Sequence, residues 1–171
     1  MPMTPFLQRF PELGTRETRS LTVAGRDDLP DGNYGLIELY CNEPNCDCRR
    51  LMVFVLRPDT GWNPWATINY GWESLDFYQK WARSSSQDRF HWQGPFLDPL
   101  GAQTQYSPLF LDLFQFLLQS PDYVQRLKDH YRLFRAAVAD DSPTSNGQER
   151  HPVVSRSTRR SDPKRPAHGL K

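Results

Sequence analysis

The sequence predicts an α+β fold, an antiparallel β-meander of three to four strands packed against about three helices. Strand-like runs joined by short turns come first, up to residue 72, and helical patterns follow between residues 74 and 140. Strands followed by helices, rather than alternating with them, are typical of an α+β domain. The composition changes after residue 140, so we expect a single α+β domain in residues 1–140 and a disordered basic tail in residues 141–171.

The strands of the meander are predicted at residues 34–41, 49–56 and 65–72, with a shorter edge strand at residues 21–24. Turn signals rich in Pro, Asp, Gly and Asn separate these runs, which favours antiparallel pairing of neighbours. In the strand at residues 34–41, successive side chains point to opposite faces. We expect the more apolar face to pack on the core, and that face carries Gly35, Ile37, Leu39 and Cys41.

The three predicted helices each follow a serine that can cap the first turn. Ser74 precedes residues 75–83, whose apolar side chains share one helical stripe. Ser107 begins a second helix that has almost no polar face, which predicts a buried central helix. Ser120 begins a third, amphipathic helix that should pack on the surface of the core. Residues 87–106, between the first and second helices, are expected to form a long loop.

The last segment has a composition that predicts disorder. Residues 1–140 carry 14 basic and 17 acidic side chains, a net charge of −3, whereas residues 141–171 carry 7 basic and 3 acidic side chains, a net charge of +4. After Val154 the only large aliphatic residue is Leu170. Such a segment cannot bury enough apolar surface to offset its ordering entropy. Since the whole chain has a net charge of only +1, contact with nucleic acid is expected only through this tail.

All three cysteines of the chain lie at the tip of the predicted hairpin, in the pattern Cys-x4-Cys-x-Cys. They are Cys41, Cys46 and Cys48. Pro44 and Asn45 suit the centre of a tight turn, which would fold Cys41 back toward Cys46. Thiolates bind zinc well, and a structural zinc ion takes four ligands in a tetrahedron. The spacing therefore predicts a Zn²⁺ site with three cysteine ligands.

The fourth ligand must come from elsewhere in the chain. His91 is the first candidate, because it follows the sheet in a segment with aromatic neighbours. His130 is the second candidate, and Asp47 or a water molecule is the third. Arg49 and Arg50 are expected to offset the negative charge of the site and to donate hydrogen bonds to sulfur.

Two other interpretations of the cysteines remain open. Arg49 and Arg50 would favour a reactive thiolate, so a thiol-based redox protein is one alternative. An open zinc position would instead indicate a metal-dependent hydrolase. Free cysteines that cluster by chance would indicate neither. A closed site with four protein ligands favours a structural metal.

We expect a small cytosolic zinc-binding domain that acts by protein interaction. The sequence contains no P-loop, no Gly-x-Ser-x-Gly and no Gly-x-Gly-x-x-Gly pattern. Its first residues lack the charged and apolar regions of a signal peptide, and no apolar run reaches membrane length. An odd number of clustered cysteines argues against a secreted disulfide framework. Trp62 or Trp65, which flank a turn, could anchor the partner protein.

Overall fold

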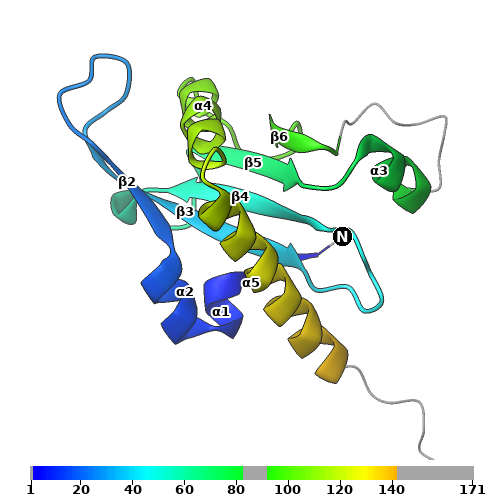
Figure 1. Ribbon diagram of the computed structural model, residues 1–171. Coiled ribbons are helices and arrows are strands. Elements are labelled where there is room, and N and C mark those ends of the chain that lie inside the picture. The colour runs from blue at the N-terminus through cyan, green and yellow to red at the C-terminus, as the bar shows by residue number, and fades with distance from the viewer. Residues whose placement is uncertain (1, 83–91, 142–171) are drawn as a thin grey trace, which may run out of the picture.

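The structure, a computed structural model, describes residues 2–82 and 92–141, which form an antiparallel sheet with helices packed against it (Figure 1). Residues 142–171 of the predicted tail lie outside the described residues. In chain order the elements are β1 (Met3–Pro5), α1 (Phe6–Arg9), α2 (Pro11–Glu17), β2 (Arg19–Val23), β3 (Gly32–Cys41), β4 (Arg50–Leu56), the 3-10 helix η1 (Pro58–Thr60), β5 (Ala66–Gly71), α3 (Leu75–Ala82), β6 (Gly94–Leu97), α4 (Ser107–Leu117) and α5 (Pro121–Asp140). The α+β class is confirmed.

The sheet has six strands among the described residues, more than the predicted three to four. Its order is β1-β3-β4-β5-β6, and β2 pairs with the first half of β3, beside β1 on the same edge. The meander β3-β4-β5 follows the prediction. β6 lies in the segment that was expected to be a loop. Gly94–Leu97 forms a strand there because it pairs with one edge of β5. β1 adds the N-terminal residues to the opposite edge of the sheet.

The face of β3 that packs on the core is the opposite of the predicted one. It carries Tyr34, Leu36, Glu38 and Tyr40, all of which are buried. On the predicted face, Gly35 and Ile37 are only partly buried, whereas Leu39 and Cys41 are buried as well. In the neighbouring strands, the side chains that share the face of Tyr34 belong to Leu51, Val53, Val55, Ile68 and Tyr70. Counting apolar residues failed here because tyrosine rings bury large areas while their hydroxyl groups find partners. The hydroxyl group of Tyr34, for example, donates to the carbonyl oxygen of Pro30 at 2.7 Å.

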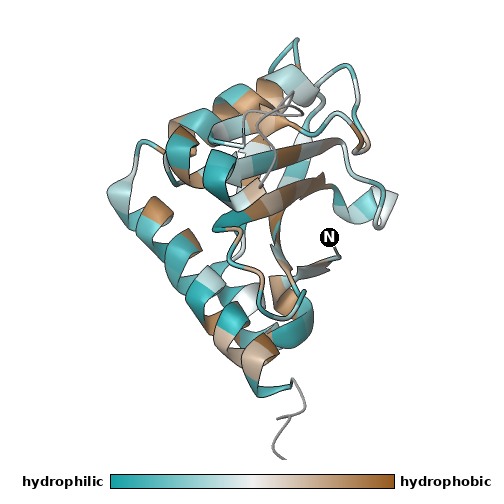
Figure 2. Ribbon diagram, turned by 90° about the vertical axis from the view of Figure 1, so that its right-hand side faces the viewer, coloured by the Kyte–Doolittle hydropathy of each residue, from teal (hydrophilic) through white to brown (hydrophobic). Residues whose placement is uncertain are grey.

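The helices α4 and α5 cover this face, and α5 runs alongside the sheet to the end of the described chain (Figures 1 and 2). Ser120 caps α5 as predicted, since its side chain accepts from the amide of Tyr123. The prediction that α4 is buried all round is wrong. Phe110 and Phe114 are fully buried, but Phe116 is 68% exposed because only one side of the helix faces the sheet.

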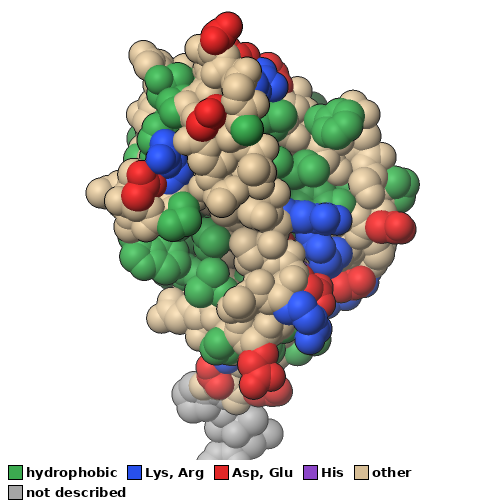
Figure 3. Space-filling view, turned by 90° about the vertical axis from the view of Figure 1, so that its left-hand side faces the viewer, with side chains coloured by type: hydrophobic (Ala, Val, Ile, Leu, Met, Phe, Trp, Pro, Cys, Tyr) green, Lys and Arg blue, Asp and Glu red, His purple; other side chains and the backbone are tan. Residues whose placement is uncertain are grey.

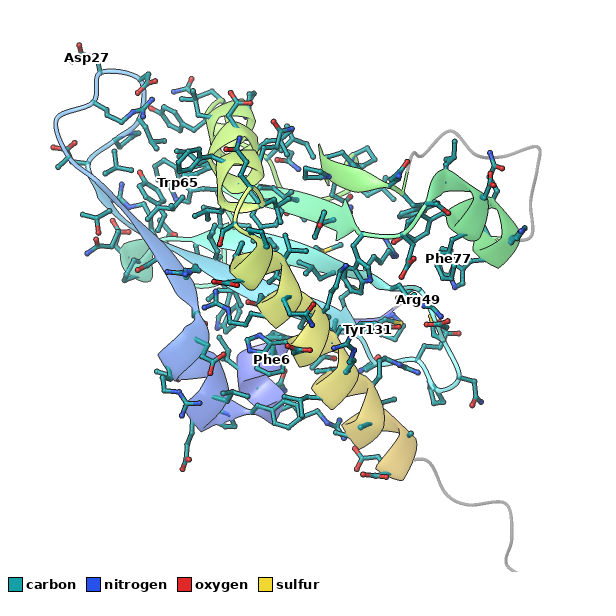
Figure 4. All side chains as sticks on the ribbon, in the orientation of Figure 1. Phe6, Asp27, Arg49, Trp65, Phe77 and Tyr131 are labelled. Carbon is teal, nitrogen blue, oxygen red and sulfur yellow. The ribbon has the colours of Figure 1, made fainter. Side chains whose placement is uncertain are left out.

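A polar cluster lies within this core between β3, α2 and α5. His130 of α5 places Nδ1 2.7 Å from Oε2 of Glu38 and Nε2 3.0 Å from Oε2 of Glu17. The hydroxyl group of Tyr40 donates to the same oxygen of Glu38 at 2.8 Å. Phe6, labelled in Figure 4, stacks on the His130 ring with their centroids 4.1 Å apart. The cluster links three elements that are remote in the sequence.

The surface shows a mixed distribution of charge. On the face seen in Figure 3, Lys and Arg side chains lie beside Asp and Glu and between hydrophobic groups, so this face offers no broad basic surface. No helix within residues 2–82 and 92–141 combines the length and the apolar character that crossing a bilayer requires.

Candidate metal centre

The loop between β3 and β4 folds back on itself and gathers the cysteines. Cys41 is the last residue of β3. The amide of Cys46 donates to the carbonyl oxygen of Glu43 at 3.3 Å, which closes the predicted turn over Pro44 and Asn45. Asn45 has a φ of 62°, a left-handed conformation that asparagine tolerates better than most residues. Arg49 also has a positive φ, of 43°, and this bend returns the chain to β4 after Cys48.

The three thiols converge on one point, as the prediction requires. The sulfur atoms of Cys41, Cys46 and Cys48 all lie within 4.8 Å of one another. Sulfur atoms bound to zinc at about 2.3 Å stand about 4 Å apart at the edges of the tetrahedron. The thiols therefore need to close by about 1 Å to hold an ion, a shift within the reach of side-chain rotation. The donor set fits a thiophilic metal such as zinc.

Hydrogen bonds among the three thiols shift their pKa values in opposite directions. A hydrogen bond with the Cys48 thiol lowers the pKa of Cys41 to about 5, against the opposing effect of burial. Burial raises the pKa of Cys46, and the hydrogen bond with Cys41 raises the pKa of Cys48. Of the three thiols, Cys41 is therefore the one whose thiolate form the surroundings favour. A bound metal ion would allow all three cysteines to carry a negative charge, since thiols that coordinate a metal are deprotonated.

Arginine side chains supply positive charge near this cluster. The charge of Arg135 adds a small contribution to the lowered pKa of Cys41. The charge of Arg50 opposes the rise in the pKa of Cys48 without cancelling it. Arg49 has a different role from the predicted one, because its guanidinium group forms a bidentate pair with Asp47 and contacts Glu73. Cζ of Arg49 also lies 4.7 Å from the ring centroid of Phe77. Figure 4 shows Arg49 at the end of the cysteine loop, in the space between helices α3 and α5.

Helix α5 holds the loop from the side. Nη1 of Arg135 donates to the carbonyl oxygens of Cys41 and Glu43 at 3.1 and 2.9 Å. The hydroxyl group of Tyr131 accepts from the amide of Arg49 and donates to Asp47, both at 3.3 Å. Sequence reasoning missed both residues, and no local pattern marks them. Their relation to the loop follows only from the packing of α5.

The candidates for the fourth ligand have different outcomes. His91 lies outside the described residues. His130 does not serve, because carboxylates already occupy both of its ring nitrogens. The carboxylate of Asp47 is held by Arg49 and does not join the cysteine group within the described chain. His91 or a water molecule therefore remains for the fourth position.

The arrangement can hold a thiophilic cation at a nearly buried position. Cys41 and Cys48 are fully buried and Cys46 is partly exposed, so an ion would be approached from the side of Cys46. Comparisons of the chain with protein-family models, with curated proteins and with solved structures found no match. The geometry of the site is therefore the basis for any functional assignment.

Proposed function

We propose that this protein is a zinc-binding domain in which Cys41, Cys46 and Cys48 hold a structural metal ion. The observation that carries the proposal is the convergence of all three thiols of the chain to within 4.8 Å. Structural zinc sites commonly use three cysteines and one histidine. Such a site would carry a formal charge of −1, which the nearby Arg135 would offset.

The proposal includes His91 as the fourth ligand, which would close the site to substrate. A closed site acts by fixing the shape of a loop rather than by chemistry. We therefore propose that the domain functions by binding another protein in the reducing cytosol, where thiols persist. Trp62, which is 60% exposed, is the proposed anchor for that partner.

One observation favours a second candidate, a thiol-based redox function. The pKa of Cys41, lowered to about 5 by its hydrogen bond with Cys48, provides a thiolate at neutral pH. Reactive cysteines also need access to their oxidant. Cys41 and Cys48 are fully buried, so burial favours the metal over the redox function.

Metal analysis of protein purified without a histidine tag tests the proposal. We expect about one zinc ion per chain, lost in Cys46→Ser and retained in the control Asn45→Gly, since glycine suits the left-handed conformation of that turn residue. His91→Ala should weaken zinc binding, whereas His151→Ala should not. Binding should weaken toward acid pH, because the ligands must lose their protons.

Two results would count against a metal centre. The first is protein that contains no metal and whose thiols react freely with a thiol reagent in the absence of a chelator. The second is reversible disulfide formation within the cluster under mild peroxide in the protein as purified. The second result would support the redox function in place of the structural metal.

A further inference from the structure

A separate site lies on the other face of the sheet, centred on Arg50. The side chains of Arg50, Met52 and Phe54 alternate along β4 with the core residues Leu51 and Val53, so they point away from the core. They line a cavity of about 560 Å³ together with Thr67, Trp92 and Asp98. A cavity of this size falls within the range of small-molecule sites in proteins.

The guanidinium group of Arg50 is buried against tryptophan rings. The residue is 5% exposed, and Cζ lies 4.2 Å from the ring centroid of Trp92 and 5.8 Å from that of Trp81. Gly71 makes this possible, because it pairs with Arg50 across the sheet and has no side chain. A Cβ atom at Gly71 would lie 2.0 Å from the carbonyl oxygen of Trp92. The bare backbone therefore lets the Trp92 segment approach Arg50.

Within the part of the chain that the structure describes, the hydrogen-bonding capacity of this buried cation is largely unused. Nη1 donates to Oδ1 of Asn69 across a long 3.4 Å, and Nε has no partner among the described residues. No carboxylate among residues 2–82 and 92–141 forms an ion pair with Arg50. Stacking satisfies the faces of a guanidinium group, but its N–H groups point outward in the plane and need acceptors. A buried charge without an anionic partner is costly.

Asp98 lines the same cavity but is committed to other partners. Oδ1 accepts from the amides of Leu100 and Gly101 at 2.7 and 2.9 Å, and Oδ2 accepts from Nδ2 of Asn69 at 2.6 Å. This carboxylate therefore holds the loop after β6 in place rather than neutralising Arg50. Its negative charge also disfavours a ligand with several negative charges.

We infer that this cavity binds a small aromatic monocarboxylate. Its carboxylate would pair with the guanidinium group of Arg50, whose planar fork suits that group. Its ring would pack on Met52, Phe54 and Trp92, the apolar part of the wall. The combination of one buried cation and an apolar lining selects an organic anion over an inorganic one.

Calorimetric titration of the full chain with 1-naphthylacetate tests this inference. The neutral 1-naphthylacetamide has the same ring and no charge, and we expect it to bind at least tenfold more weakly. Arg50→Gln should abolish the preference for the acid. Arg57→Gln is the matched control, since Arg57 also lies over two rings, those of Tyr34 and Trp65, but pairs with Asp59. Its binding should be unchanged.

A second measurement does not depend on the folding of any variant. In a ¹H–¹⁵N spectrum of the unaltered protein, the Nε–H signal of Arg50 should shift on addition of naphthylacetate and stay in place with the amide. Equal binding of acid and amide, or binding that survives Arg50→Gln, would overturn the inference. So would a lack of binding to the unaltered protein, or binding of inorganic phosphate as tight as that of the acid.

Discussion

Replacing Glu38 by leucine should destabilise the domain by about 3 kcal/mol. The side chain of Glu38 is 5% exposed, and that of its partner His130 is 4% exposed. Nδ1 of His130 lies 2.7 Å from Oε2 of Glu38. Removing one member of a buried pair costs about 3–5 kcal/mol, because the other stays desolvated. We expect the lower end of this range, since His130 keeps Glu17 and Tyr40 keeps the carbonyl oxygen of Leu127.

The loss can be measured by urea unfolding followed by far-ultraviolet circular dichroism. The control Glu38→Gln keeps an acceptor oxygen and removes only the charge, so it should cost about 1 kcal/mol, the difference between a charged and a neutral hydrogen bond. His130→Leu completes a double-mutant cycle with Glu38→Leu. The double variant should lose less than the sum of the single variants, with a coupling energy of about 0.5–3 kcal/mol.

Two results would refute this reasoning. A loss below about 1 kcal/mol in Glu38→Leu would mean that the carboxylate is not a buried partner of the histidine. Additive losses in the cycle would mean that the two side chains do not interact. Since domains of this size are stable by about 5–15 kcal/mol in total, both results lie within the range of the measurement.

Three further outcomes are expected. Phe114→Ala should destabilise by about 3–5 kcal/mol in the same urea assay, whereas the exposed Phe116→Ala should stay within about 0.5 kcal/mol. Burial lowers the pKa of His130, but the bonds and charges of its two glutamates outweigh this and raise it. Its stabilisation should therefore be complete below about pH 6.5 and be lost as the pH rises through the raised pKa, so the difference from His130→Leu should shrink in alkaline urea titrations. Deleting residues 145–171 should leave the melting temperature nearly unchanged, and a drop of many degrees would show that the tail docks on the domain.

The elements that local sequence signals define were predictable. A proline after a serine marked the starts of α4 and α5, although the serine side chain caps only α5 and the N-cap of α4 is Tyr106. Turn residues separated β3, β4 and β5. The convergence of the cysteines also follows from a local feature, the turn at Pro44 and Asn45. Each of these signals acts over a few residues, which is the range that a sequence pattern covers.

Features set by distant contacts were not predictable. The core-facing side of β3 includes Glu38, whose buried carboxyl group contacts the ring of His130 from 92 residues away. The strand β6 forms because the edge of β5 is available to it, and its own four residues carry no clear strand pattern. The interaction of Arg135 with the cysteine loop likewise has no local signal.

The bonds from Arg135 to the carbonyl groups of Cys41 and Glu43 can form only late during synthesis. The bonded residues are 94 and 92 positions apart in the chain, and a ribosome makes the cysteines long before the arginine. A nascent chain therefore carries three thiols on a loop that its own turn shapes but that α5 does not yet support. The proposed metal centre would gain the contacts of Arg135 only when α5 has emerged and docked.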